Sequence, residues 1–584
     1  MSRSRIKITV WVRLVLALLA ARLVAFGCRL FGHPGTSLPG VVALKIFPGL
    51  VQFLVPGYER VLAVTGTNGK TTTANLLAHT LRRAGFTVAH NAEGANMLPG
   101  VATALIRDCT RLGRPRSRVA LLEVDEGSVA KVFAAARPEL VIVTNYFRDQ
   151  LDRYWELERT TALLRSAVAG LPGVTLILNG DDPLVASVGR GHPRTCYFGV
   201  LRDTAPAGAV PSGTVSPGAA PSVAALPGAT SAGGSLPGVS AGAASPGSTS
   251  PGAAPPAAPA GAAPSGGIPD QVAGIVLKGS GETREGRFCL CCGTALVYHY
   301  YHYGQLGDYF CPDCGFHRPV LDFAAFDVNA GDALRFSLRF SLSGPGSSEP
   351  GLLSRGFNRS GLNSGLSGLQ PPAGGSRTPE PCRNLFLEAP LRGFYNVYNV
   401  LGAAAAALTL GIPAGCLKTA LLDYTPALGR MEEFIFQGRP CTLALIKNPA
   451  GVDEVLKTIL EGRTEKALVI AINDLAADGR DVSWLWDADF ARLAGARIKK
   501  IICAGRRAAD LAVCLKYAGI DPGRLALAPE RAASLKILAQ QAAEGVEELY
   551  VLATYTNLFP YAGLLRRWGK VVERGAAQSM PSLS

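Results

Sequence analysis

The segment TGTNGKTT at positions 65–72 constrains the fold more than any other part of the chain. The apolar run 60–64 precedes it, and a run typical of a helix follows from Thr73 to Ala84. A strand, a tight glycine turn and the start of a helix make an anion site, because backbone N–H groups and the helix dipole point at phosphate oxygens. The sequence therefore predicts ATP binding by Gly66, Thr67, Asn68, Gly69, Lys70, Thr71 and Thr72.

Two side chains of this loop suit a nucleoside triphosphate. Lys70 can reach the β- and γ-phosphates, and the Thr71 hydroxyl can hold Mg²⁺. The loop is a short form with Gly66 and Gly69, because Val64 stands where the longer phosphate loop has its first glycine. A plain strand–turn–helix connection is the alternative interpretation.

Five more segments with a recognisable pattern follow in order. They are EVDE at 123–126, TNYFRDQLDRY at 144–154, NGDDP at 179–183, YNVYNVLGAA at 395–404 and GRME at 429–432. Together with the short glycine loop, and over about 370 residues, these segments resemble the Mur ligase family.

Mur ligases activate a carboxylate as an acyl phosphate and couple it to an amine. The resemblance implies an α/β fold with a Mur-type central ATP-binding domain, in which Lys70 stabilises the phosphate charge during catalysis. It implies that Glu123 binds Mg²⁺ together with Thr71. It also implies that Asn396 and Asn399, on the adenine-side helix, bind ATP, and that Arg430, in a hinge into the last domain, does so too.

Three places depart from the family pattern. Many Mur ligases carry a carbamylated lysine, and the matching segment 162–165 has no lysine. Gln150 stands where the other ligases have His, and Trp155 where Gly is usual. The first two changes fit a small amine such as ammonia.

Four cysteines in two C-x-x-C pairs predict a zinc ribbon at 286–318. Eighteen residues separate the pairs, and a glycine that permits a tight turn follows each pair. Four thiolates close a tetrahedral site without an open position, so a structural zinc ion is expected at Cys289, Cys292, Cys311 and Cys314. A redox pair or an iron site is the alternative. The aromatic run 298–303 is expected to pack within the hairpin of the ribbon rather than to stack on nucleic acid.

The 584 residues are enough for several domains. The Mur-type domain is expected at 59–200 and 269–428, and the last domain at 429–584. The segments 201–268 and 343–381 are low in complexity and rich in small residues and proline, so they are predicted to be disordered insertions.

Residues 1–58 form a basic and apolar lead-in. They carry seven Lys and Arg but no Asp or Glu, within a net charge of +14 for the chain. The run Ile8–Phe26 is mostly apolar, but Arg13 and Arg22 interrupt it, so it falls short of a spanning helix. We expect either an amphipathic helix on the inner membrane face with its arginines among the headgroups, or an ordinary packed helix. The ATP site and the scattered cysteines predict a cytoplasmic protein, peripheral at that membrane on the first alternative.

Beyond Arg430, strand-like runs at 467–472, 500–504 and 548–553 alternate with helical runs. This alternation predicts an α/β domain with a mostly parallel sheet. Such sheets carry sites at the carboxyl ends of their strands, where two polar loops follow at 473–484 and 554–557.

The ribbon, KNPAG at 447–451 and DGRDVSWLWDADF at 478–490 are similar to one branch of the family, the ligase subunits of lipid II isoglutaminyl synthases. This resemblance implies amidation of the α-carboxylate of D-glutamate in the lipid II stem peptide to D-isoglutamine. The ammonia comes from a separate GatD-like glutaminase subunit, which forms a heterodimer with the ligase. It also implies that Asp478 or Asp481 completes the Cys–His triad of that partner. The alternative is that both are turn or cap residues in a solvated loop.

Two other functions compete with amidation. A stand-alone Mur-like amino-acid ligase would act without a glutaminase and would need a pocket for an amino-acid carboxylate. A zinc-ribbon scaffold with a vestigial nucleotide site would bind nucleic acid and turn over no ATP. The intact set of Gly66, Lys70, Thr71 and Glu123 argues against the scaffold, so no nucleic-acid partner is expected. The loop of the last domain argues against the stand-alone ligase.

Overall fold

The computed structural model describes residues 8–31, 35–91, 95–147, 156–202, 286–331, 333–341, 383–426, 430–460, 464–475 and 478–571. Several sequence predictions fall outside these ranges. They concern the segment 203–268, the segment 343–381 and the positions Gln150, Trp155 and Gly429.

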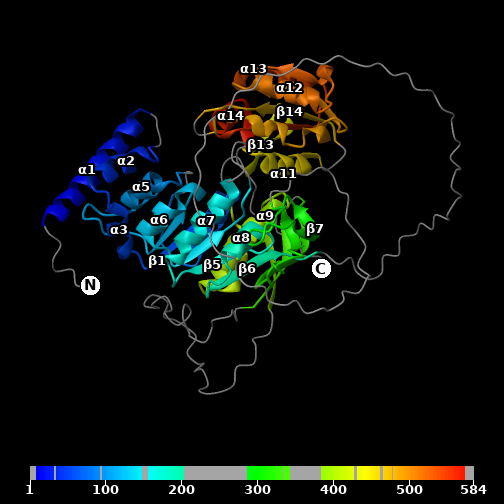
Figure 1. Ribbon diagram of the computed structural model, residues 1–584. Coiled ribbons are helices and arrows are strands. Elements are labelled where there is room, and N and C mark those ends of the chain that lie inside the picture. Colours follow the sequence, from blue (N-terminus) through cyan, green and yellow to red (C-terminus); the bar gives the residue numbers. More distant parts are fainter. Residues whose placement is uncertain are drawn as a thin grey trace, which may run out of the picture. The chain divides into compact units, whose positions relative to one another are not determined.

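A nine-stranded sheet carries the first part of the fold (Figure 1). Its strand order is β11-β10-β9-β6-β5-β4-β1-β3-β2. Seven neighbouring strands, from β9 to β2 in this order, run parallel, and β10 and β11 are antiparallel additions at one edge. The strands are β1 (Arg60–Thr65), β2 (Val88–His90), β3 (Val119–Glu123), β4 (Leu140–Val143), β5 (Thr175–Asn179), β6 (Thr195–Val200), β9 (Phe323–Asn329), β10 (Leu334–Phe340) and β11 (Arg383–Ala389).

Helices cover both faces of this sheet, because parallel strands are apolar on both sides. Side chains of β1 alternate between two cores: Leu62 and Val64 pack with α4, α9 and α10, whereas Val61 and Ala63 face the other core. The first core uses α4 (Lys70–Arg83), α9 (Tyr395–Thr409) and α10 (Ala414–Leu422). The second core uses α5 (Leu98–Asp108), α6 (Val129–Ala136), α7 (Glu156–Ala169) and α8 (Pro183–Val188), together with the N-terminal helices.

The C-terminal part contains a second sheet, with the strand order β16-β15-β14-β17-β13-β12-β18. The five strands from β16 to β13 are parallel, and β12 and β18 are antiparallel. The strands are β12 (Arg430–Phe436), β13 (Arg439–Leu445), β14 (Lys466–Ala471), β15 (Ile498–Ala504), β16 (Leu525–Leu527), β17 (Glu548–Ala553) and β18 (Gly569–Val571). One core includes α11 (Pro449–Leu460) and α12 (Ala508–Tyr517), and another includes α13 (Arg531–Ala543) and α14 (Tyr555–Trp568). The predicted α/β class with mostly parallel sheets is confirmed.

A two-stranded antiparallel hairpin lies between β6 and β9 in the sequence. Its strands are β7 (Val297–Tyr303) and β8 (Leu306–Phe310), and it carries the aromatic run. Tyr303 is buried in the first core, where its ring stacks on Phe147 with 5.7 Å between the centroids. The aromatic run thus packs partly into the body of the protein, beyond the hairpin itself.

In the described part of the chain before β1 lie three α-helices, followed by a short 3-10 helix at Val55–Gly57. The α-helices are α1 (Ile8–Leu30), α2 (Leu38–Ile46) and α3 (Leu50–Leu54). By length and composition α1 is able to cross a membrane, and the sharply bent stretch from Leu38 to Gly57 is a second candidate among the residues that the structure describes. One side of α1 packs into the second core through four fully buried residues, Leu14, Ala17, Leu18 and Ala21.

Arg22 does not lie free to reach lipid headgroups, as the hypothesis of a membrane-surface helix required. Its guanidinium donates to Cys109 O at 2.8 Å and to Thr110 O at 3.0 Å. Backbone carbonyls of the protein, rather than lipid headgroups, satisfy this arginine. This side of α1 therefore follows the packed alternative.

Candidate active site

The phosphate loop joins β1 to α4, and two of its glycines have positive φ. Gly66 has φ +123° and Gly69 has φ +84°. A Cβ atom at Gly66 would collide with the Thr144 hydroxyl and the Asn145 backbone, and one at Gly69 would collide with the Asn399 amide. Both positions therefore need glycine for the backbone angle and for the space. The helix begins at Lys70, three residues earlier than its apolar pattern indicated.

The loop after β4 holds the phosphate loop from the side. Thr144 Oγ1 donates to Asn68 O at 2.7 Å, and Asn68 N donates to Asn145 Oδ1 at 2.9 Å. Thr67 N donates to Asn145 O at 2.8 Å, and Thr67 Oγ1 donates to Phe147 O at 3.2 Å. These four hydrogen bonds hold the backbone of the phosphate loop against the loop after β4, which limits the conformational freedom that nucleotide binding has to remove.

Lys70 is the buried cation of the loop. Its Nζ donates to Glu126 Oε2 at 2.9 Å, to Thr67 O at 3.1 Å and to Gly66 O. Burial alone would lower the pKa of Lys70. The nearby carboxylates, led by Glu126, outweigh burial and raise the pKa above its usual value. Lys70 therefore carries a positive charge at neutral pH beside the helix N-terminus, where phosphate oxygens are best stabilised.

Thr71 and Glu123 meet beside this lysine. Thr71 Oγ1 lies 3.1 Å from Glu123 Oε1, and Glu123 is 1% exposed. Two oxygen ligands in adjacent positions of an octahedral Mg²⁺ site, each about 2.1 Å from the metal, lie about 3 Å apart. The pair therefore fits Mg²⁺ without movement. Asn91 supports Glu123 by exchanging two hydrogen bonds of 2.8 Å with its backbone.

The turn after β3 adds two further carboxylates, Asp125 and Glu126. Burial raises the pKa of Asp125, and the neighbouring charge of Glu126 raises it further, against the opposing effect of Lys70. A site that concentrates negative charge next to one lysine favours additional positive charge. A divalent cation would supply it.

The adenine-side residues lie at the start of α9. Asn399 Nδ2 donates to Asn396 Oδ1 at 2.8 Å, and Asn396 Nδ2 donates to Arg392 O at 2.6 Å. The Asn399 side chain also borders Gly69, so the structure brings α9 and the phosphate loop together. Arg430 starts β12, where its backbone pairs with Ala444, and its side chain lies outside the described atoms.

Three residues at this site were not among the predicted site residues: Asn145, Glu126 and Asn448. Asn448 Nδ2, from the loop after β13, donates to Asn68 Oδ1 at 3.1 Å. The sequence did contain signals, since Asn145 and Glu126 belong to the recognised segments TNYFRDQLDRY and EVDE, and Asn448 belongs to KNPAG. What the sequence lacked was the proximity of these segments to the phosphate loop.

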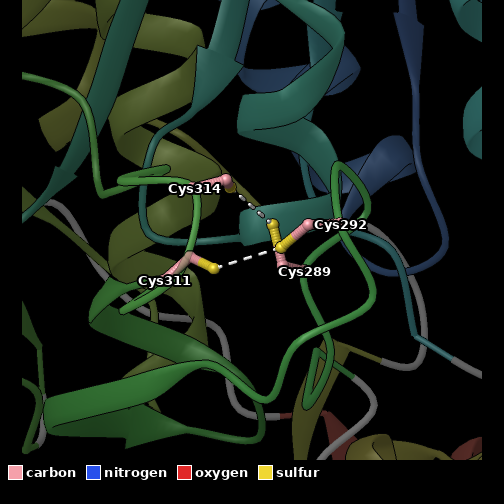
Figure 2. Close-up of side chains that lie close together, drawn as sticks. All are labelled: Cys289, Cys292, Cys311 and Cys314. Atoms are coloured by element: carbon pink, nitrogen blue, oxygen red, sulfur yellow. Dashed lines mark hydrogen bonds between the residues drawn. The ribbon is translucent and has the colours of Figure 1, made fainter. Parts of the chain in front are cut away.

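The four predicted cysteine ligands converge on one point (Figure 2). Cys289 Sγ lies 3.5 Å from Cys314 Sγ, and Cys292 Sγ lies 3.4 Å from Cys311 Sγ. All four sulfur atoms lie within 4.8 Å of one another. A tetrahedral site with metal–sulfur bonds of about 2.3 Å would place its sulfurs about 3.8 Å apart. The cluster is therefore able to hold a metal ion.

Hydrogen bonds connect the hairpin beside this cluster to the NGDDP turn. Gln305 Nε2 donates to Tyr146 O and, at 3.3 Å, to Asp182 Oδ2. Burial raises the pKa of Asp182 to about 7, although hydrogen bonds from Tyr146, Leu184 and other donors oppose the rise. The neighbouring Asp181 pairs with Arg318 at 2.6 Å. The ribbon is thus tied to residues next to the phosphate loop.

The two candidate aspartates of the last domain have different surroundings. Asp478 accepts from Thr556 N at 2.7 Å and from Thr556 Oγ1 at 2.5 Å. Asp481 Oδ1 accepts from Ser483 N at 2.8 Å and from Ser483 Oγ at 2.5 Å. The other oxygen, Asp481 Oδ2, is buried and has no hydrogen-bond partner among the described residues. Asp481 therefore holds the first residue of the short helical turn Ser483–Trp486, whereas Asp478 links its loop to the start of α14.

Two family models match the chain. The Mur ligase middle domain matches residues 64–204, and the MurT ligase C-terminal domain matches residues 445–558. The first match contains the phosphate loop and Glu123, and the second contains Asp478 and Asp481.

Curated relatives match over most of the chain. The chain is 28% identical over 511 residues to the lipid II isoglutaminyl synthase (glutamine-hydrolyzing) subunit MurT of Staphylococcus aureus, which covers 88% of both chains. It is 27% identical over 550 residues to the subunit of the same name from Streptococcus pneumoniae, with 94% of this chain and 96% of the relative covered.

Solved structures agree on the fold. A pseudomurein peptide ligase type C from Methanothermus fervidus superposes with a TM-score of 0.54 at 19% identity, over 87% of this chain and 78% of that one. MurF from Acinetobacter baumannii superposes with a TM-score of 0.53 at 14% identity, over 91% of this chain and 81% of that one. With the loop geometry, the two matching domains and the two curated relatives, the chain is a ligase that belongs to the MurT family of the Mur ligases.

Proposed function

We propose that this chain is the ATP-dependent ligase subunit of a lipid II isoglutaminyl synthase. It would convert the α-carboxylate of D-glutamate in the lipid II stem peptide to the amide, giving D-isoglutamine. The observation that carries the proposal is the combination of Lys70, Thr71 and Glu123 at one phosphate loop with a C-terminal domain of the MurT type. Both relatives named above bear this activity in their names.

The chemistry has two balanced steps. A carboxylate oxygen of the substrate attacks the γ-phosphorus of ATP, which gives an acyl phosphate and ADP. Ammonia then attacks the carbonyl carbon, the bond from that carbon to the phosphate oxygen breaks, and the departing inorganic phosphate takes up the proton that the nitrogen loses. Lys70 and the N–H groups of residues 66–71 would stabilise negative charge on the phosphates in the first step.

Thr71 and Glu123 would hold Mg²⁺ at the phosphates. The ion, when bound, supplies positive charge that neutralises the β- and γ-phosphate oxygens. Asn91 keeps Glu123 in position through its two backbone hydrogen bonds. Asn396 and Asn399 would border the adenine side, and their mutual hydrogen bond fixes both amides before ATP enters.

Ammonia would come from a separate GatD-like glutaminase subunit in a heterodimer. Of the two candidate aspartates, the surroundings favour Asp478 as the residue that orients the partner's histidine. Asp481 Oδ2 is enclosed, and its other oxygen is used by Ser483. Each carboxylate oxygen of Asp478 accepts one hydrogen bond from Thr556. Each can accept a further hydrogen bond as well.

The four cysteines would hold a structural zinc ion. The ligand set is complete with four thiolates, so no position is open for a substrate or a catalytic water. Its contribution would be to the folding of the ribbon. On the proposal that the substrate is lipid-linked and that ATP is consumed, the protein would lie in the cytoplasm, in contact with the inner face of the membrane.

The decisive experiment measures amidation of lipid II by the purified full-length protein with ATP. Activity with ammonium alone, and with glutamine only after the glutaminase is added, is the expected result. A Lys70→Ala variant should lose both activities. ATP-dependent joining of an amino acid, with no amidation under either condition, would instead establish the stand-alone ligase.

A further inference from the structure

Helix α1 has a second apolar face, opposite to its buried one. Residues 12, 16, 19, 23, 26 and 30 follow one another at steps of four and three, and at about 100° per residue such steps form a straight line along a helix. All six side chains are large, apolar and exposed. Their exposed fractions are 50% for Val12, 52% for Leu16, 51% for Leu19, 72% for Leu23, 60% for Phe26 and 70% for Leu30. We call this line the α1 stripe.

Single exposed leucines are ordinary on protein surfaces, but a continuous line of six is not. Spread over about 27 Å of helix, the stripe leaves a large apolar area in contact with water. Burying that area would be favourable in proportion to its size. No other described element of the chain covers it, so a surface outside these described elements is expected to do so.

Although α1 is long and apolar enough to span a membrane, its packing in this fold allows it only to lie on a membrane surface. Leu14, Ala17, Leu18 and Ala21 are fully buried on the opposite side, and Arg22 is bonded to the loop at Cys109 and Thr110. A spanning helix would have to give up all of these contacts. Only the stripe is therefore available to lipid, and the helix axis would lie along the surface.

Charge identifies the surface. Arg13 and Arg29 are exposed and lie on opposite flanks of the stripe at the helical spacing, and Trp11 lies on the same flank as Arg29. An apolar line with cationic flanks and a tryptophan is the arrangement of interfacial helices, because arginine reaches the headgroups while its stem stays in the apolar layer. No acid occurs in the sequence before Glu59.

We propose that the α1 stripe docks on an anionic phospholipid bilayer, with α1 parallel to the surface and the stripe buried at the boundary of headgroups and acyl chains. A second copy of the chain is the other occupant that the heptad-like spacing suggests. Two such helices would bring arginines together without an acid on α1 to pair with them, so the charge favours lipid.

This docking deepens the proposed function, on which it rests for its biological purpose: a lipid-linked substrate is presented at a bilayer surface. Its physical basis, the stripe and the flanking charge, is independent of catalysis. A binding measurement therefore tests the docking, and the amidation assay tests the function. Each can fail while the other succeeds.

The test is flotation of the full-length protein with vesicles. One set is made of phosphatidylcholine alone, and the other contains phosphatidylcholine with phosphatidylglycerol at about one part in three. We expect flotation with the anionic vesicles, weakened by high salt, and little with the neutral ones. The double variant Leu19→Ser with Leu23→Ser should lose at least tenfold in partitioning, because two apolar anchors are removed.

A matched control replaces two exposed apolar residues elsewhere, Val320→Ser with Leu527→Ser, and should float as the unaltered protein does. A third variant, Arg13→Gln with Arg29→Gln, keeps the stripe and should weaken binding to the anionic vesicles only. If thermal unfolding shows that the leucine variant does not fold, the arginine variant still tests the docking.

Three outcomes would overturn the docking. The first is that the unaltered protein fails to float with the anionic vesicles, and the second is that the leucine variant floats as well as the control. The third is that sedimentation finds a dimer of the unaltered protein that the leucine variant does not form, while neither protein binds vesicles. The last outcome would assign the stripe to a second copy.

Discussion

Lys70 Nζ lies 2.9 Å from Glu126 Oε2, so a carboxylate holds the lysine that is expected to meet the phosphates of ATP. The same carboxylate contributes most to the rise in the pKa of Lys70 against the effect of burial. ATP and Glu126 are thus competitors for one cation.

Replacing Glu126 should therefore strengthen nucleotide binding. In Glu126→Gln the lysine keeps a neutral hydrogen-bond partner but loses a competing charge, so we expect ATP to bind about 3- to 10-fold more tightly. Titration calorimetry without the peptide substrate measures this. The matched control is Glu139→Gln, which removes a similar ion pair with Arg60 away from the loop. Weaker binding in the first variant would show that Glu126 serves the nucleotide or its metal.

Two glycines with nearly the same positive φ allow the cost of backbone strain to be measured apart from the cost of a side-chain collision. Gly69 and Gly85 have φ near +84° and +88°, but a Cβ atom would collide with Asn399 only at Gly69. We expect Gly85→Ala to cost about 1 kcal/mol of stability from the backbone alone. Gly69→Ala should cost more, and ATP affinity should fall at least tenfold because the loop must move. Denaturant unfolding and nucleotide titration measure both, and equal effects of the two substitutions would refute the collision.

The pKa of Asp182 predicts a dependence of stability on pH. Its value of about 7 lies above the ordinary value near 3.9, so between these pH values the folded protein holds a proton that the unfolded chain has released. The contribution of this group to stability is then greatest below about pH 4 and is lost as the pH rises to 7. In Asp182→Asn the fall in unfolding free energy between pH 5 and pH 7 should be smaller. Asp521→Asn, at an exposed turn, should leave the fall unchanged.

The metal cluster can be tested with a neighbouring cysteine as its control. Cys311→Ser removes one of the four converging thiols, and we expect zinc affinity to fall at least about 100-fold and the melting temperature to drop. Cys291→Ser, an exposed cysteine outside the cluster, should keep about one zinc ion per chain. Metal content after dialysis against a chelator distinguishes the two. Equal zinc content in both variants would contradict the four-thiolate site.

The proposed role of Asp478 toward the partner's histidine predicts different effects on glutamine-dependent and ammonium-dependent amidation. With the glutaminase added, Asp478→Asn should lower glutamine-dependent amidation about 10²- to 10⁴-fold, because the partner's histidine loses its orienting charge. Ammonium-dependent amidation by the same variant should be unchanged. Asp481→Asn should retain both activities, apart from a small loss of stability at its turn. A reversal of the two phenotypes would move the role to Asp481.

The phosphate loop was predictable because its chemistry is local. Glycines, Lys70 and Thr71 follow one another in eight residues, and the flanking strand and helix have clear patterns. The four cysteines were equally predictable, since spacing alone defines a pair of knuckles. Glu123 came from the family resemblance, and the structure places it within 3.1 Å of Thr71.

Contacts between distant segments were not predictable. Asn448 reaches Asn68 across 380 positions, and Gln305 reaches Tyr146 across 159. Each contact depends on how complete sheets pack, and a single sequence carries no such information. The two faces of α1 were missed for a different reason: the helix is apolar nearly all round, so its periodicity did not separate the buried line from the exposed one.

The turn of the hairpin beside the cysteine cluster is connected to the phosphate loop through a short chain of contacts. Gln305 bonds to Tyr146 O, Tyr303 stacks on Phe147, and Phe147 O accepts from Thr67. On the proposal that the cluster holds zinc, a cell deprived of this metal would lose support for its nucleotide pocket. On the proposed function, amidation of the cell wall precursor would then decline with zinc supply even when ATP and glutamine are abundant.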